Sequence, residues 1–204
     1  PGGGSATMKV LSVHVLRWNN DTPEPVMLSA AHDLGDFGWF QRGSVQEMLT
    51  FVSRTLTQRL SGMQVVDHEG YHCHCVVKTD GLSGVMVTDV EYPARVAFSA
   101  IQGLLDEFVA AQPDWRGVTE DGGAEFPGTD AALKKYQNPR EVDKIMRITA
   151  DLEETKEVLH QTIDAVLERG TKLEELVEKS DDLSAQSKMF YKQAKKTNKC
   201  CVIS

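Results

Sequence analysis

The C-terminal third of the chain carries the pattern that most restricts its fold. From Glu141 to Thr197 there is no proline and one glycine, Gly170, and mostly apolar residues recur in alternating steps of three and four. This spacing is typical of the a and d positions of a coiled coil. The surrounding residues are rich in Glu, Asp and Lys, so we expect the seam to be buried against partner helices. The predicted seam comprises Ile145, Ile148, Leu152, Thr155, Leu159, Thr162, Val166, Arg169, Leu173, Leu176, Ser180, Leu183, Ser187, Phe190, Ala194 and Thr197.

Arg169 is the one charged member of this seam. The seam keeps its register on both sides of Arg169, which favours a guanidinium inside a helical bundle. A seam that drifts around the helix axis would instead leave it on a solvated flank. A buried guanidinium is costly unless neighbours accept its hydrogen bonds, so we expect partner helices to supply neutral or anionic oxygens. Such a layer would set the register of the bundle more than its stability.

The first two thirds of the chain predict a separate α+β domain. Strand patterns occupy 9–18, 26–30, 71–77 and 82–90, with one more strand or strand edge in 62–70, and helix patterns occupy 44–60 and 93–112. This order predicts an antiparallel five-stranded sheet with flanking helices. Ser44 and Glu47 have capping-box spacing, so we expect the first helix to begin there.

The remaining boundaries follow from loop and capping signals. Residues 114–128 are rich in Gly, Asp and Glu and predict a loop, followed by a short helix near 131–136. Asn138 and Pro139 then have the pattern of a helix start. We therefore divide the chain into a disordered leader or tag, the α+β domain, the coiled-coil segment and a tail, at 1–7, 8–137, 138–199 and 200–204.

The last four residues have the pattern of a lipidation signal. Cys201 is followed by two aliphatic residues and a terminal serine, which usually selects farnesyl. One isoprenoid holds a protein to a bilayer only marginally, so we expect reversible palmitoylation at Cys200 as a second anchor. Five lysines and no acid between Lys188 and Lys199 would favour an anionic membrane surface. The alternative is a pair of free reactive thiols.

Other functional classes find little support in the sequence. A net charge of -8 argues against nucleic-acid binding. There is neither an apolar run of about 18 residues nor a signal-peptide pattern, so we expect no transmembrane helix and a cytoplasmic chain. The motif at 72–75, HCHC, contains zinc ligands, but alternate strand residues face opposite sides, so we expect no metal site. A phosphate-binding loop and a nucleophile elbow are both lacking, which argues against a GTPase or another enzyme.

Five segments of the chain resemble one protein family. The run from Val166, VLERGTKLEELVEKSDDL, is similar to the synaptobrevin-like v-SNARE motif. The other four segments are FQRGSVQEMLTF (40–51), EYPARVAF (91–98), YQNPREVDK (136–144) and MFYKQAKKTNKCC (189–201). In their order along the chain they resemble the YKT-type prenylated R-SNAREs. The resemblance implies a longin (profilin-like) fold for the first domain, followed by a long helical SNARE motif that forms a coiled coil in complex.

The resemblance also implies a function and its partners. Arg169 would be the zero-layer arginine, meeting three glutamines from Qa, Qb and Qc SNARE proteins. The complex would drive fusion of intracellular vesicles, for example in ER to Golgi transport. The protein would divide between the cytoplasm and the cytoplasmic face of Golgi, ER-derived, endosomal or vacuolar membranes. It would need no cofactor, and would carry only covalent farnesyl and palmitoyl groups.

A longin domain of this kind further implies an autoinhibitory groove between its first helix and the edge of the sheet. The groove would hold the SNARE segment in an intramolecular contact, or hold the lipid. Candidates for its surface are Phe37, Phe40, Met48, Phe51 and Val52, although ordinary core packing explains Met48 and Val52 equally well. The alternative function is a lipidated longin adaptor or tether, whose coiled coil pairs with one partner or with itself without driving fusion.

Overall fold

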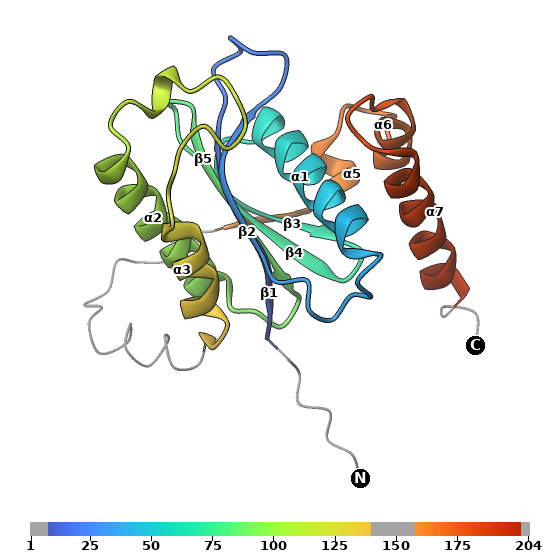
Figure 1. The fold of residues 1–204 in the computed structure, drawn as a ribbon. Helices are drawn as coiled ribbons and strands as arrows, with labels where there is room; N and C mark the ends of the chain where they lie inside the picture. The colour runs from blue at the N-terminus through green and yellow to red at the C-terminus, as the bar shows by residue number, and fades with distance from the viewer. Residues whose placement is uncertain (1–7, 140–157, 201–204) are drawn as a thin grey trace.

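The computed structural model of the chain describes residues 8–139 and 158–200, and the side chains of the latter range up to 197 (Figure 1). It is an α+β fold in which helices cover both faces of one sheet. The strands are β1 (Val10–Arg17), β2 (Val26–His32), β3 (Gly62–His68), β4 (Tyr71–Val77), β5 (Leu82–Asp89) and β6 (Leu159–Thr162). The helices are α1 (Arg42–Arg59), α2 (Ala94–Ala111), α3 (Gly128–Tyr136), α5 (Ile163–Val166), α6 (Leu173–Lys179) and α7 (Ala185–Cys200), with a 3-10 turn η1 (Trp115–Gly117).

The sheet has the strand order β2-β1-β5-β4-β3-β6. Strands β1 to β5 pair antiparallel, as the hairpin patterns predict. The β3–β4 turn is tight because both of its central residues, Glu69 and Gly70, have positive φ angles of 47° and 85°. The predicted count of five strands is one too low. The sixth strand, β6, comes from the predicted coiled-coil segment and pairs parallel with β3.

Two apolar clusters lie on opposite faces of the sheet, because side chains alternate along each strand. One cluster contains Val13 and Val15 of β1 and packs beneath α2 and α3. The other contains Leu16 of the same strand and packs beneath α1. Cys73 and Cys75 of β4 also face α1. The sheet is therefore buried on both sides. Helix α1 lies on the side where residues from the C-terminal part of the chain also pack.

Helix α1 begins at Arg42, two residues before the predicted start. Gln41 precedes it without a side-chain capping hydrogen bond, so the predicted capping box between Ser44 and Glu47 is wrong. The reason is that the helix already includes both residues, which leaves the Glu47 carboxylate directed away from the helix start. It accepts hydrogen bonds instead from Ser184, which directly precedes α7, and from Ser187 in the first turn of α7.

The C-terminal segment, defined as residues 158–200, is folded in pieces in this single chain. It consists of β6, α5, α6 and α7, and non-helical residues separate α5 from α6 and α6 from α7. The long continuous helix expected for the SNARE motif therefore applies to the complex with partner helices and not to this closed single chain. Four predicted seam residues, Ile145, Ile148, Leu152 and Thr155, lie outside the described residues, as do the leader (1–7) and Cys201.

Candidate functional site

The C-terminal segment packs against α1 and the free edge of β3, and we call this arrangement the closed form (Figure 1). Strand β6 extends the sheet, with Gln64 of β3 opposite Leu159 and Asp67 opposite Thr162. The amide of Gln161 donates a hydrogen bond to the side-chain oxygen of Gln64. Helices α6 and α7 then form a hairpin joined by ion pairs between Lys192 and Glu178 and between Lys195 and Glu174, and α7 packs on α1. The contact therefore joins residues more than 90 positions apart in the sequence.

The closed form buries a row of apolar side chains from the C-terminal segment. They join one cluster with Met48, Val52 and Leu56 of α1 and with Val66 and Cys73 of the sheet. Burial of this kind stabilises by about 1.5–3 kcal/mol per large side chain before ordering entropy is subtracted. The buried members from the segment are Ile163, Leu167, Leu173, Val177, Leu183 and Tyr191, each at most 5% exposed.

Tyr191 also anchors α7 to the tip of the β3–β4 hairpin. Its ring stacks on that of His68, with ring centroids 6.3 Å apart and an angle of 18° between the planes. Burial raises the pKa of Tyr191, and the carboxylates of Glu69 and Glu174 add to the effect. The phenol therefore stays neutral at physiological pH and acts as an apolar contact.

A polar contact holds the start of α7 to α1. The Glu47 carboxylate accepts hydrogen bonds from the Ser187 hydroxyl at 2.6 Å and from the Ser184 backbone N–H at 3.0 Å. Burial alone would raise the pKa of Glu47, but the hydrogen bonds from Ser187 and Ser184 outweigh it and the pKa is lowered. The Ser184 hydroxyl accepts from the Ser187 N–H, as an N-cap does. Glu47 thus satisfies donors at the N-terminus of α7.

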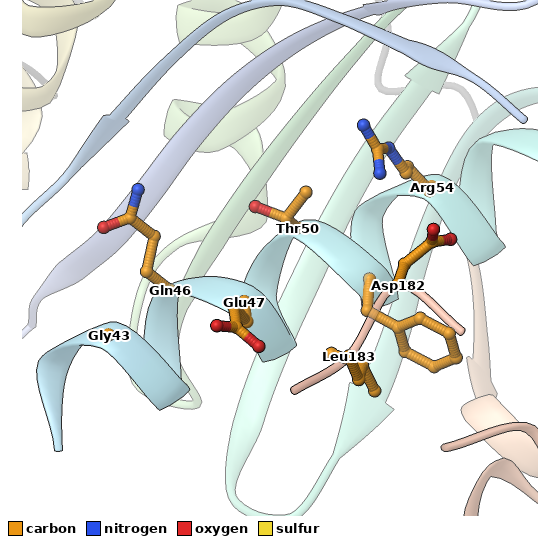
Figure 2. A pocket seen from close by; sticks show the side chains of 8 residues that line it. Gly43, Gln46, Glu47, Thr50, Arg54, Asp182 and Leu183 are labelled. Carbon is orange, nitrogen blue, oxygen red and sulfur yellow. The ribbon is translucent and has the colours of Figure 1, made fainter. Parts of the chain in front are cut away.

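A shallow pocket of about 320 Å³ lies along this contact (Figure 2). It is lined from α1 by Gly43, Gln46, Glu47, Thr50, Phe51 and Arg54, and from the α6–α7 connection by Asp182 and Leu183. The Arg54 guanidinium is engaged by Glu24 at 2.8 Å and by Asp121. The pocket is therefore formed by the contact between the two parts of the chain, and α1 alone does not make it.

The structure brings three of the five predicted groove residues to this contact. Met48 and Val52 lie in the buried cluster, and Phe51 packs against it half-buried and lines the pocket. Phe37 and Phe40 do not join them. Both belong to the connection between β2 and α1, where Phe37 is half-buried and Phe40 is 63% exposed.

Sequence reasoning missed Glu47 and several apolar residues of the contact. Glu47 stands four residues before Phe51, on the same face of the helix, and that spacing was the available signal for its role. Among the apolar residues, Leu167, Val177 and Tyr191 were overlooked because each stands beside the heptad seam and not on it. An apolar residue next to a seam was the signal for a second contact face.

The described seam residues are only partly covered in the closed form. Leu173, Leu183 and Ser187 are buried, whereas Leu159 is 58% exposed. Three further seam residues, Thr162, Arg169 and Thr197, are also exposed. The half-buried members are Val166, Leu176, Ser180, Phe190 and Ala194. The closed form therefore uses a face of the segment that only overlaps the predicted coiled-coil face.

Arg169 lies in the connection between α5 and α6. The next residue, Gly170, has a φ angle of +91°, a left-handed conformation that favours glycine. The Thr171 N–H donates to the carbonyl oxygen of Glu168 at 2.8 Å, which closes the turn. In the closed form this turn interrupts the helix at the residue expected to form the central layer.

The histidine and cysteine motif of β4 is divided between the two faces of the sheet. Cys73 and Cys75 lie in the cluster beneath α1. Burial, with a contribution from Asp67, raises the pKa of Cys73 to about 12. On the other face, His74 donates to or accepts from the Thr88 hydroxyl at 3.0 Å, and burial lowers its pKa to about 3. The two cysteines and His74 are therefore buried on opposite faces of the sheet as part of the interior of the domain.

Two family models match consecutive parts of the chain. The longin model, described as a regulated-SNARE-like domain, matches residues 34–126, and the synaptobrevin model matches residues 144–203. Among the residues that the structure describes, no helix is long and apolar enough to cross a bilayer. The two models together correspond to the α+β domain and to the segment that packs on it.

Curated relatives from fungi and plants match the chain over nearly its whole length. It is 44% identical to the synaptobrevin homolog ykt6 of Schizosaccharomyces pombe, over 97% of this chain and all of that protein. It is 47% identical to the VAMP-like protein YKT61 of Arabidopsis thaliana and 41% identical to the synaptobrevin homolog YKT6 of Saccharomyces cerevisiae, over 96% of this chain and all of each relative. The chain therefore belongs to the YKT6 family of longin-domain synaptobrevin homologues, non-enzymatic R-SNAREs of vesicle trafficking.

Proposed function

We propose that this protein pairs through residues 138–199 with Qa, Qb and Qc SNARE helices and so drives the fusion of intracellular vesicles. Arg169 would form the central layer, with its guanidinium bonded to oxygens of the partner helices. The longin domain, residues 8–137, would hold the segment inactive before pairing. The observation that supports this autoinhibition is the closed form itself, in which the segment is divided and docked on α1 and β3.

The closed form would inhibit pairing mainly through the shape of the segment. A coiled coil needs one continuous helix with all seam residues on one side. In the closed form β6 is extended, and Gly170 stands in a left-handed turn between α5 and α6. Leu159 stays exposed, so covering the seam is only part of the effect. Release would let the segment refold as one helix along its partners.

We further propose that the protein is held to membranes by farnesyl on Cys201 and reversible palmitoyl on Cys200. Two lipid chains are needed for stable attachment, so removal of palmitoyl would return the protein to the cytoplasm. Lysines of α7 would support attachment to the anionic cytoplasmic leaflet of Golgi, ER-derived, endosomal or vacuolar membranes. Zippering toward the lipidated end would then draw two bilayers together.

Mixing the full chain with purified Qa, Qb and Qc helices tests the pairing. We expect a heat-stable four-helix complex with one copy of each chain, and a lowered melting temperature for Arg169→Leu. Lys172→Leu, an exposed position beside the seam, is the matched control and should melt as the wild type does. Homodimers, or a complex with one partner only, would instead favour the lipidated tether.

A second variant tests the autoinhibition. Phe51→Glu places a carboxylate against the buried cluster and should loosen the segment, because an unpaired charge is costly there. We expect the variant to assemble with Q-SNARE helices faster than the wild type, and more of it to associate with membranes in cells. Val109→Glu, on the exposed side of α2, serves as the control. Equal assembly rates for Phe51→Glu and the wild type would count against autoinhibition by this contact.

A further inference from the structure

Two large aromatic side chains protrude from the connection between β2 and α1. We call residues 33–41 the aromatic loop. Trp39 is 81% exposed and Phe40 is 63% exposed, more than any other large apolar side chain among the described residues. Their rings meet edge to face, with centroids 6.3 Å apart and an angle of 85° between the planes. Neither ring contributes to the two apolar clusters of the fold.

Hydrogen bonds within the aromatic loop hold this exposed pair in place. The Gln41 N–H donates to the Gly38 carbonyl oxygen at 2.8 Å, and the Gly38 N–H donates back to the Gln41 side-chain oxygen at 3.2 Å. The Arg42 side chain donates to the Phe37 carbonyl oxygen at 3.1 Å. The two rings are thus presented on an ordered turn, and little entropy would be lost if they became buried.

The aromatic loop lies at the end of the sheet where α7 runs toward the C-terminus (Figure 1). Burial and the nearby Asp36 carboxylate of the loop raise the pKa of Tyr71, which opens β4 directly after the β3–β4 turn. On the other side of that turn, His68 stacks on Tyr191 of α7. The aromatic loop and the middle of α7, at Tyr191, therefore both lie near this turn in the closed form.

The size and chemistry of the protrusion fit a lipid surface better than a protein partner. A stable protein interface buries about 800 Å² on each side, which two side chains flanked by Asp36 and glycines do not provide. Tryptophan and phenylalanine are favoured at the boundary between water and the acyl chains of a bilayer. Helix α7 ends at Cys200 and Cys201 follows it, so a bilayer held at the proposed anchor would lie at the end of α7, on the side of the sheet where the aromatic loop protrudes (Figure 1).

The charges of α7 are compatible with the same surface. Lys192 and Lys195 pair with Glu178 and Glu174 of α6 at 2.7 and 2.5 Å, and all four side chains are at least partly exposed. Exposed ion pairs of this kind contribute little to stability. The lysines can therefore exchange these partners for anionic lipid headgroups at small cost.

We propose that Trp39 and Phe40 form a second membrane contact, which inserts into the interfacial layer of the bilayer that holds the C-terminal tail, while the protein remains closed. The proposal rests on the proposed function for the position of the anchor, but it needs neither pairing with Q-SNAREs nor release of the segment. It gives the longin domain a fixed orientation on the membrane.

A synthetic anchor allows this contact to be measured without enzymatic lipidation. In a Cys200→Ser background, one single-chain alkyl maleimide is coupled to Cys201, since Cys73 and Cys75 are buried. A single chain anchors only marginally, so an added contact changes the bound fraction. The lipidated full chain is then mixed with phosphatidylcholine vesicles, with and without phosphatidylserine, and partition is measured by flotation.

The double variant Trp39→Ser, Phe40→Ser should partition at least about tenfold less into the vesicles, because two large apolar side chains lose their burial. The matched control Val109→Ser, on α2, should partition as the parent does. Bromine atoms on the acyl chains should quench tryptophan emission in the parent. This quenching should be lost in Trp39→Phe, which keeps an aromatic ring and should still bind.

Three outcomes would overturn the proposal. The first is equal partition of the double variant and the parent, and the second is quenching that persists in Trp39→Phe. The third is an aromatic pair that increases binding to membranes that retain their proteins but not binding to the lipid vesicles. The last would assign the pair to a protein partner. Assembly with Q-SNARE helices in solution should be the same for the double variant and the parent. A failure of that assembly would therefore refute the proposed function without affecting the vesicle result.

Discussion

Val177 and Leu176 are adjacent residues of α6 that should separate the closed form from the SNARE complex. Val177 is fully buried in the closed form and stands beside the predicted seam, whereas Leu176 is on the seam and half-buried. Val177→Ala removes two methyl groups, worth about 1.6 kcal/mol of burial, and leaves a small cavity. The better helix propensity of alanine offsets about 0.5 kcal/mol. The closed form should therefore lose about 2 kcal/mol, which corresponds to about thirtyfold more opening.

Native-state hydrogen exchange measures this opening directly, because it reports the free energy of local unfolding. In Val177→Ala the amides of β6 and α6 should exchange about thirtyfold faster, while those of β1 and β5 should keep wild-type rates. Assembly with Q-SNARE helices should accelerate by up to the same factor, since only open molecules can pair. The melting temperature of the assembled complex should hardly change.

Leu176→Ala is the complementary variant, which should weaken the SNARE complex more than the closed form. It should lower the melting temperature of the complex, because it truncates a seam residue, and should have the smaller effect on exchange in the closed form. The reasoning would be refuted if both variants opened the closed form equally. It would also be refuted if the amides of β1 exchanged faster by the same factor as those of β6, because the segment would then unfold only together with the whole domain.

Three further predictions concern single side chains. Glu47→Ala removes the acceptor of the Ser187 hydroxyl and should make amides at the start of α7 exchange hydrogen about tenfold faster. Unchanged exchange would show that this contact contributes nothing to the stability of the closed form. The pKa of His74 is lowered to about 3 in the folded state, so below about pH 6.5 the unfolded chain binds a proton that the folded chain does not. The free energy of unfolding should therefore decline by up to about 1.4 kcal/mol per pH unit toward pH 4. Urea unfolding at several pH values should show a flatter pH dependence for His74→Asn than for the wild type. Gly84→Ala would drive a methyl group into Ile101 of α2 and should destabilise the domain by about 1–3 kcal/mol in the same assay, and a change near zero would mean that α2 can shift.

Most of the domain was accessible from sequence because local patterns and tertiary packing agree there. The hairpin at 71–90 has alternating strands around a turn with glycine, and the structure has β4 and β5 at these positions. Disagreement arises where a distant segment decides the local structure. Residues 159–162, LHQT, have no strand pattern, and they become β6 because β3 offers unpaired backbone groups at its edge.

The site was also only partly predictable from the sequence, because a distant segment of the chain completes it. Met48, Phe51 and Val52 were accessible because the family resemblance implies a groove along the first helix, on which all three residues lie. The SNARE segment was expected at this groove, but which of its residues make the contact was not accessible, since a heptad pattern describes the complex with other chains. Val177 and Tyr191 are apolar residues that the heptad leaves unused, and the closed form is where they are buried.

The pairing of β6 with β3 has a consequence for the protein once its segment is recruited by partners. From Gln64 to Asp67, the backbone groups of β3 that face β6 are then left without their strand partner. A bare strand of this kind is a template for association with other chains, and natural proteins usually protect it. The opened domain should thus be the more aggregation-prone state, so a cell would have reason to restore the folded-back chain soon after each round of fusion.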